Sequence, residues 1–270
     1  MRDRWTTWYA ATRTAARAWT AAAGPLSEHV EALLLPRSCV SCERPMSRGR
    51  EAMVCDACWA RVATLPYPRC ERCGHPGVGE SCRWCPILPP YVRAARSWCW
   101  IPGGVSERIL YAMKYDGWHG IAPELAERMA RLTWPADVRD ECAALIPVPL
   151  AADRLRTRGY NQSRVLADSL APHLGVPVWD DVIERQRATP SQTRLTPEQR
   201  LTNVAHAFRV VTERQSKLRG AHVILVDDVV TTAATLNECA TTLWDAGARI
   251  ISYVTFGRAR AAGDAPLSRG

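Results

Sequence analysis

Two adjacent acids follow a short apolar run late in the chain. Residues Val223 to Val226 are apolar without interruption, which is typical of a parallel strand buried on both faces. Asp227 and Asp228 then fall at the carboxyl end of that strand, where open α/β sheets bind their ligands. We expect one carboxylate to hold the hydroxyl pair of a ribose and the other to hold Mg²⁺.

Three threonines after these acids predict a phosphate site. Thr231, Thr232 and Thr235 lie where the next helix, expected over Leu236–Ala246, begins. Their hydroxyls, together with the free backbone N–H groups of a first helical turn, can surround a phosphate group. The segment therefore predicts a site for a phosphorylated, metal-bound sugar. An acidic turn that merely caps a helix is the alternative.

A second chemical signal is the spacing of eight cysteines in four Cys-x-x-Cys pairs. Each pair aims two thiolates at one point, and two pairs complete a tetrahedral S₄ site that suits zinc and leaves no position open for catalysis. The zinc would therefore be structural. Sequential pairing is the simplest arrangement, although the spacing also allows an interleaved pairing or the loss of one site. The predicted ligands are Cys39, Cys42, Cys55 and Cys58 for one ion, and Cys70, Cys73, Cys82 and Cys85 for the other.

Two alternatives accompany this zinc prediction. A disulfide framework would also use closely spaced cysteines, but no secretory signal precedes them, and Cys99, Cys142 and Cys239 would be left as an odd set. His75 lies beside Cys73, where it could replace a thiolate as a ligand or remain a solvated loop side chain.

The composition of the chain is that of a soluble, basic protein. Of its 270 residues 47% are hydrophobic, and no apolar run approaches the roughly 18 residues that a membrane-spanning helix needs. The net charge of +8 comes almost wholly from arginine, because Lys114 and Lys217 are the only lysines. A pI near 9.1 is compatible with nucleic acid or other polyanions. Neither an RNA-binding aromatic signature nor a helix-turn-helix pattern is found in the sequence. We expect the protein to be cytoplasmic.

Composition and prolines divide the chain into three predicted parts. Residues 1–35 form a basic N-terminal extension that ends in a short helix, and residues 36–86 form the cysteine module. Three prolines within residues 86–90 mark a linker, so the main domain is expected over residues 91–260. The composition of residues 1–24 fits a transit peptide, a membrane-surface helix, or an extension that is poorly ordered or starts at an upstream codon.

Strands and helices alternate in the main domain. This alternation predicts right-handed crossovers and a parallel sheet, so the expected fold class is α/β. Residues 185–203 contain two prolines and many polar groups, and we predict that they form a mobile lid. The expected strands are Arg96–Ile101, Ala143–Val148, Val223–Val226 and Arg249–Phe256, and the expected helices are Val105–Tyr115, Pro123–Leu132, Asn161–Leu174 and Leu236–Ala246.

The segment from Val223 to Thr235 resembles the loop of type I phosphoribosyltransferases that binds phosphoribosyl pyrophosphate (PRPP). In that loop an apolar strand is followed by two acids, two apolar residues and Thr-Thr-Gly-x-Thr. The resemblance implies that Asp227 and Asp228 are catalytic. Ala233 stands where the family usually has glycine, which permits positive φ, and we expect a negative φ at Ala233. The implied phosphate-binding residues are Val229, Val230, Thr231, Thr232, Ala233, Ala234 and Thr235.

Further segments make the chain similar to the ComF family, phosphoribosyltransferase-like proteins linked to competence and DNA uptake. Members carry a cysteine module ahead of the transferase-like domain. The implied fold is therefore an α/β domain of the type I phosphoribosyltransferase kind, with a parallel sheet, preceded by a small Cys₄ zinc-ribbon module. The matching segments are Met113-Lys114-Tyr115, Ile146-Pro147-Val148-Pro149-Leu150 and Arg158-Gly159-Tyr160-Asn161-Gln162-Ser163, with Arg187, Thr189, Gln192, Leu195, Arg200, Asn203 and Phe208 downstream.

The resemblance also implies where pyrophosphate and substrate bind. Arginines suit this role because a planar guanidinium can contact phosphate through two hydrogen bonds. Asn161 would equally serve as a helix cap, and Arg187 and Arg200 as solvated loop residues. The implied residues are Pro149, Leu150, Arg154, Arg158, Asn161, Gln162, Arg187 and Arg200.

The leading hypothesis is a PRPP-binding, phosphoribosyltransferase-like protein with structural zinc, with Mg²⁺ bound alongside PRPP, and with a link to DNA uptake. The sequence leaves open whether ribose 5-phosphate is transferred with release of pyrophosphate. The alternative is a non-catalytic protein that handles single-stranded nucleic acid and senses PRPP in its pocket. The expected partners are PRPP, single-stranded DNA and other proteins of competence or DNA uptake.

Overall fold

The computed structural model of the chain describes residues 38–46, 52–77, 82, 84–186, 206–260 and 264. Two compact units divide the chain between Met53 and Val54. The predicted N-terminal extension and most of the predicted lid, with Arg187 and Arg200, lie outside the described residues. Among the described helices, none is long and apolar enough to cross a membrane.

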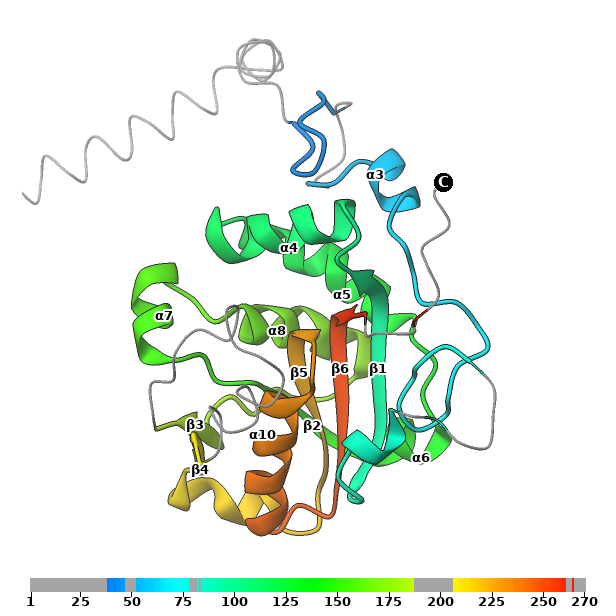
Figure 1. The fold of residues 1–270 in the computed structure, drawn as a ribbon. Coiled ribbons are helices and arrows are strands. Elements are labelled where there is room, and N and C mark those ends of the chain that lie inside the picture. The colour runs from blue at the N-terminus through cyan, green and yellow to red at the C-terminus, as the bar shows by residue number, and fades with distance from the viewer. Residues whose placement is uncertain are drawn as a thin grey trace, which may run out of the picture. The chain divides into compact units, whose positions relative to one another are not determined.

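The described helices and strands belong to the second unit (Figure 1). The strands are β1 (Val92–Ile101), β2 (Cys142–Pro147), β3 (Ile183–Arg185), β4 (Phe208–Val210), β5 (His222–Val230) and β6 (Ile250–Ala259). The α-helices are α3 (Asp56–Ala60), α4 (Val105–Tyr115), α5 (Ala122–Ala130), α6 (Ala136–Glu141), α7 (Ala152–Arg158), α8 (Gln162–Leu174) and α10 (Ala234–Asp245). Three 3₁₀ turns are η1 (Cys85–Ile87), η2 (His119–Ile121) and η4 (Thr212–Leu218).

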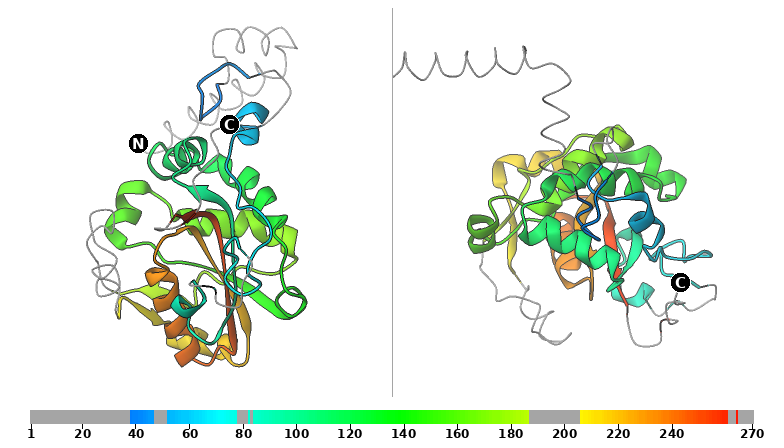
Figure 2. Two further views of the ribbon diagram at one scale, coloured as in Figure 1. Left: turned by 45° about the vertical axis from the view of Figure 1, so that its right-hand side comes forward. Right: turned by 90° about the horizontal axis from the view of Figure 1, so that it is seen from above.

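Four of these strands form a parallel sheet in the order β1-β6-β5-β2, and β3 and β4 form a separate antiparallel pair. Helices α5 and α8 lie on one face of the sheet and α10 on the other (Figures 1 and 2). Because both faces are covered, the run Val223 to Val226 in β5 is buried throughout. The predicted α/β class with a parallel sheet is confirmed.

Helix α8 shows how the apolar periodicity builds the core. Leu166, Ala167 and Leu170 are buried, whereas Val165 and Leu174, which the pattern also places inward, are only partly buried. Each fully buried leucine stabilises the fold by about 1.5–3 kcal/mol relative to an exposed one. These three residues therefore form the buried face of α8, which packs against β2 and β5.

Strand β5 continues beyond its predicted end. It runs to Val230 because its backbone keeps pairing with β6, where Asp227 faces Thr255 and Val230 faces Arg258. Asp227 and Asp228 therefore lie within the strand. The predicted strand end at Val226 is wrong, because backbone pairing with β6 continues past the apolar run, but the acids still lie near the carboxyl end of the strand.

The apolar pattern does not predict helices α6 and α7. Helix α7 contains no buried residue, so it lacks the periodicity on which such a prediction depends. It carries Arg154 and Arg158, two of the predicted pyrophosphate-binding residues, and it ends at Gly159 with a φ of 81°. Strand β1 also begins earlier than predicted, at Val92.

The first and third cysteine pairs fold into the same turn. The backbone N–H of Cys39 donates to the Arg44 carbonyl at 2.9 Å, and that of Cys70 donates to the His75 carbonyl at 2.9 Å. The residue after the third pair is Gly74, whose φ is 67° and whose added Cβ would lie 2.4 Å from the Ala95 carbonyl oxygen. This turn therefore requires glycine on two counts, conformation and close approach to β1.

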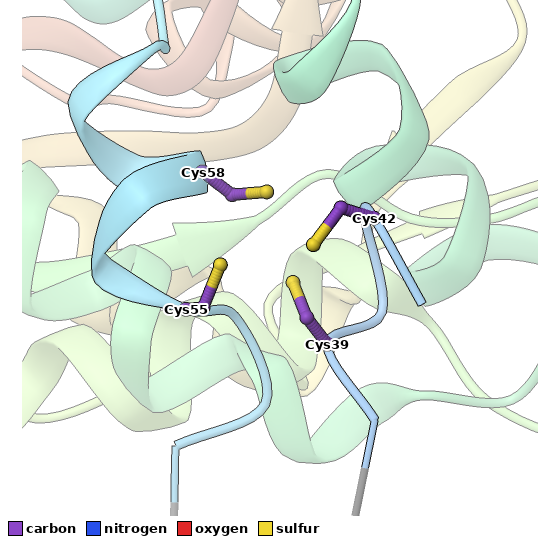
Figure 3. Close-up of side chains that lie close together, drawn as sticks. All are labelled: Cys39, Cys42, Cys55 and Cys58. Atoms are coloured by element: carbon purple, nitrogen blue, oxygen red, sulfur yellow. The ribbon is translucent and has the colours of Figure 1, made fainter. Parts of the chain in front are cut away.

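The eight cysteines gather into two sets of four, as sequential pairing predicts. In each set the sulfur atoms lie within 4.8 Å of one another. Figure 3 shows the side chains of Cys39, Cys42, Cys55 and Cys58, which point toward one centre. In the other set the Cys70 and Cys85 sulfurs are 3.4 Å apart, and those of Cys73 and Cys82 are 3.3 Å apart. A tetrahedral site with Zn–S bonds of about 2.3 Å would space its sulfurs about 3.8 Å apart.

No disulfide occurs among the described cysteines, so the disulfide alternative is wrong. The surroundings of the second set also suit a metal. Arg258, near the end of β6, is only 3% exposed. Burial lowers the pKa of its guanidinium, and the Cys73 and Cys82 thiolates counteract that effect. Four thiolates around Zn²⁺ carry a net charge of about −2, for which a buried guanidinium is a suitable partner.

His75 fits neither alternative left open for it. The sulfur sets exclude it as a ligand, and its side chain is only 12% exposed. Its ring centroid lies 5.5 Å from that of Trp84 and 5.9 Å from that of Trp100, and its Nε2 is 3.2 Å from an Asp264 carboxylate oxygen. Aromatic packing therefore withdraws it from solvent.

We predict about two zinc ions per chain and loss of order in residues 36–86 on chelation, because metal binding supplies the folding free energy of so small a module. Cys73→Ser should lose about one zinc ion by elemental analysis. Cys142→Ser, at a partly buried cysteine outside both sets, is the matched control and should keep both. A zinc-free protein with its fold intact would contradict this prediction.

Candidate functional site

One cleft of about 680 Å³ opens at the carboxyl ends of β2 and β5. Helices α4 and α7 and the first turns of α8 and α10 contribute to its walls. Two of the predicted PRPP- and substrate-binding residues, Asn161 and Thr232, do not line the cleft. Two others, Arg187 and Arg200, lie outside the described residues. The predicted residues that the cleft brings together are Asp227, Asp228, Val229, Val230, Thr231, Ala233, Ala234, Thr235, Pro149, Leu150, Arg154, Arg158 and Gln162.

The two acids have different surroundings. Asp227 Oδ1 accepts a hydrogen bond from Ser163 Oγ at 2.8 Å and from the backbone N–H of Asp228 at 2.9 Å. Burial, together with the neighbouring Asp228 carboxylate, raises the pKa of Asp227 above its usual value. Asp227 is therefore the member of the pair that holds a proton more readily.

Asp228 is 5% exposed and forms an ion pair with Lys114 of helix α4. Its Oδ1 also accepts from Gln162 Nε2 at 3.5 Å. Burial would raise the pKa of Asp228, but Lys114 together with the hydrogen bonds from Asp227 and Gln162 outweighs burial, so the pKa falls below its usual value. Burial would lower the pKa of Lys114, but the Asp228 carboxylate raises it, and the pKa of Lys114 lies above its usual value. Asp228 is therefore a carboxylate and Lys114 an ammonium.

The phosphate loop contains one left-handed residue. Ala233 has φ 60° and ψ 4°, so the expectation of a negative φ is wrong. The strand ends at Val230 and helix α10 begins at Ala234, and Ala233 is the N-cap position that redirects the chain between them. Its carbonyl already accepts from the Asn237 N–H at 2.8 Å. An alanine in this conformation costs about 1 kcal/mol relative to glycine.

The loop also presents the start of α10 to the cleft. Thr231, Ala233, Ala234 and Thr235 line the cleft, and the first backbone N–H groups of a helix have no partner within that helix. Thr232 does not line the cleft, and its Oγ1 accepts a hydrogen bond from the backbone N–H of Ala234 at 3.5 Å. This arrangement, with the positive end of a helix dipole, favours an anion.

Helix α7 forms a wall of the cleft that carries two arginines. Arg158 donates to Gln162 Oε1 and its guanidinium lies 5.2 Å from the Tyr115 ring centroid. Arg154 lines the same wall. Asn161 caps α8, because its Oδ1 accepts from the Ser163 N–H at 3.1 Å, and its Nδ2 donates to the Val148 carbonyl at 3.0 Å. The cap interpretation of Asn161 is confirmed.

Sequence reasoning missed several polar residues of the cleft, among them one lysine, one serine and one arginine. Lys114, Ser163 and Arg185 all line it, yet none was a candidate site residue. Lys114 had a signal, since it is one of two lysines in the chain and belongs to the Met113-Lys114-Tyr115 segment. The contact of Ser163 with Asp227 depends on the packing of α8 against β5, which no local pattern announces.

The cleft therefore combines two acids at a strand end, a helix N-terminus and a wall of arginines. The acids can accept hydrogen bonds from sugar hydroxyls, the helix N-terminus can bind a phosphate, and the arginines can bind a second phosphate group. These three elements suit a sugar that carries phosphate groups at two positions.

Comparison with known proteins agrees with this geometry. The family model described as "Phosphoribosyl transferase domain" matches residues 161–267, and the one described as "Double zinc ribbon domain" matches residues 30–87. The DNA utilization protein YhgH of Salmonella typhimurium is 31% identical over 229 residues, which cover 81% of this chain and 96% of that protein. Competence protein F of Haemophilus influenzae is 27% identical, with 83% and 96% covered.

Competence protein ComFC of Bacillus subtilis is 25% identical over 201 residues, which cover 72% of this chain and 79% of that protein. The zinc ribbon match contains all eight clustered cysteines, and the transferase match contains both acids and the phosphate loop. With both matches in this order and similarity over most of its length, the chain belongs to the ComF family, in which a double zinc ribbon precedes a phosphoribosyltransferase-like domain.

Proposed function

We propose that this protein binds PRPP together with Mg²⁺ in the cleft at the ends of β2 and β5. The observation that carries the proposal is the single cleft that joins the acids of β5, the N-terminus of α10 and the arginines of α7. In this proposal residues 91–260 bind the ligand, residues 36–86 form a zinc-stapled module, and the protein acts in the cytoplasm.

Each part of PRPP has a counterpart in the cleft. The loop Thr231–Thr235 would hold the 5′-phosphate, the acids would accept from the ribose hydroxyls, and Arg154 and Arg158 would contact pyrophosphate. The donor set also fits Mg²⁺, which prefers oxygen ligands and keeps phosphate oxygens and water in its shell. Asp227 would contribute the protein's carboxylate, because Asp228 is paired with Lys114, and when Mg²⁺ binds, Asp227 would release the proton that it holds more readily than Asp228 does. Bound Mg²⁺ would supply charge neutralisation of the pyrophosphate.

The reaction that this site would support is transfer of ribose 5-phosphate. The bond between ribose C1 and the pyrophosphate oxygen would break, and a bond between C1 and the acceptor nucleophile would form. Arg154 and Arg158 would stabilise the departing negative charge, and Asp227 or Asp228 the positive charge that grows on the ribose. Relatives named for competence and DNA utilization support a role for this chain in DNA uptake, alongside other proteins of that process.

A second candidate function is the handling of single-stranded DNA without catalysis. One observation favours it: two aromatic side chains of the cleft lining are exposed, Tyr111 at 57% and Tyr115 at 61%. Tyr111 and Tyr115 line the cleft beside Arg158. Exposed aromatic rings next to arginines are the surface on which single-stranded bases stack.

For the acids, we predict that Asp227→Asn combined with Asp228→Asn abolishes PRPP binding measured by calorimetry. Loss of two charge-assisted contacts at about 1.5–3 kcal/mol each corresponds to a weakening of roughly a hundredfold or more. Asp140→Asn, at an exposed acid on α6, is the control and should bind like the unaltered protein. Unchanged PRPP affinity in a folded double variant would refute the proposed function.

Ala233→Gly should tighten PRPP binding severalfold. Alanine disfavours the left-handed conformation that the loop adopts by about 1 kcal/mol, so glycine raises the population of that conformation. Ala234→Gly is the matched control, since this neighbour lies in helix α10, where glycine lowers stability by about 0.5–1 kcal/mol without aiding the loop. Equal PRPP affinities for Ala233→Gly and the unaltered protein would show that the loop changes conformation on binding.

If single-stranded DNA binds, its affinity should fall steeply with salt and depend little on sequence. The slope of log affinity against log salt is about −0.7 per phosphate contact for single strands. Replacing Tyr111 and Tyr115 by alanine should weaken binding, whereas Tyr67→Ala, which removes an equally exposed tyrosine outside the cleft, should not. A salt-independent affinity would speak against this second function, and pyrophosphate release would favour the first.

A further inference from the structure

Lys114 forms an ion pair with one member of the acid pair. It lies in the last turn of α4 and reaches Asp228 Oδ2 as an ion pair, with its side chain 23% exposed and that of Asp228 7% exposed. It also lines the cleft. A positive charge is therefore already present beside the acids before any ligand binds.

The surrounding contacts hold this ion pair in place. Gln162 Nε2 donates to the other oxygen of Asp228 at 3.5 Å, and Arg158 in turn donates to Gln162 Oε1. The Tyr160 hydroxyl donates to the Met113 carbonyl, which fixes the backbone next to Lys114. Each oxygen of Asp228 thus faces a donor, one from α4 and one from α8.

Anchoring α4 does not explain this ion pair. The helix is already fixed by the fully buried side chains of Ile109 and Met113 and by the Tyr160 hydrogen bond. Taking a lysine and an aspartate out of water is costly, and a hydrophobic pair would often serve stability equally well. The charge of Lys114 therefore points to the chemistry of the cleft.

We propose that Lys114 is a resident cation that reserves Asp228 for the ribose hydroxyls and prevents the acid pair from binding a divalent metal ion by itself. Two adjacent carboxylates would otherwise form an oxygen-rich, doubly negative site of the kind that Mg²⁺ and Mn²⁺ bind. With Lys114 in place, Mg²⁺ enters the cleft only with the phosphate oxygens of PRPP. This inference rests on the proposed function and assigns Lys114 as a positioning and metal-excluding residue.

The test measures Mn²⁺ alone, without PRPP, by the loss of the free-ion signal in electron paramagnetic resonance. The unaltered protein should bind Mn²⁺ weakly in the cleft, whereas Lys114→Met should bind one additional ion with an affinity at least tenfold higher. Adding Asp228→Asn to Lys114→Met should abolish the gain, because the released carboxylate is its source. Lys217→Met is the matched control: it removes the other lysine, which pairs with Asp181, and should behave like the unaltered protein.

Thermal melts establish that each variant is folded, and Lys114→Gln replaces Lys114→Met if the latter does not fold. Tight Mn²⁺ binding by the unaltered protein, or no gain in either Lys114 variant, would overturn the inference. PRPP binding is measured separately on the unaltered protein. Its absence would refute the proposed function and leave the Mn²⁺ comparison standing, so the two failures are distinguishable.

Discussion

Burial of two adjacent carboxylates at the end of a parallel strand is the constraint on which the cleft depends. Strand β5 keeps pairing with β6 through Val230, so Asp227 and Asp228 cannot swing away into solvent as loop residues would. Two close carboxylates cannot both stay ionised without compensation. Lys114 and Gln162 compensate Asp228, and Ser163 supports Asp227, which is why α4 and α8 both converge on this strand end.

The sequence could predict the features that have a local signal, and it could not predict those that arise from tertiary packing. The parallel sheet and its main helices follow from apolar periodicity, and the zinc ligands follow from cysteine spacing, because both signals are local. Helix α7 buries no residue and leaves no period to detect. Strand β5 is predicted too short because Asp227 and Asp228 interrupt its apolar run, although their backbone pairing with β6 does not depend on side-chain polarity.

The cleft shows the same division between local and tertiary information. The acids and the threonines of the phosphate loop could be identified because they form one contiguous segment. Lys114 could not, because it lies 114 positions before Asp228 in the chain and meets it only in the folded protein. The left-handed conformation of Ala233 could not be predicted from its residue type, which disfavours it. It follows from the need to join the end of β5 to the start of α10 at this angle.

Strand β6 links the metal module to the cleft. Thr255 of β6 pairs with Asp227, and three residues later the buried Arg258 lies beside Cys73 and Cys82, a distance of about 10 Å along the strand. A chelator used to strip Mg²⁺ from a binding assay would also remove the zinc whose thiolates offset the charge of Arg258. Ligand affinities measured on preparations with different zinc contents would then describe different molecules, so zinc content is part of the definition of the sample.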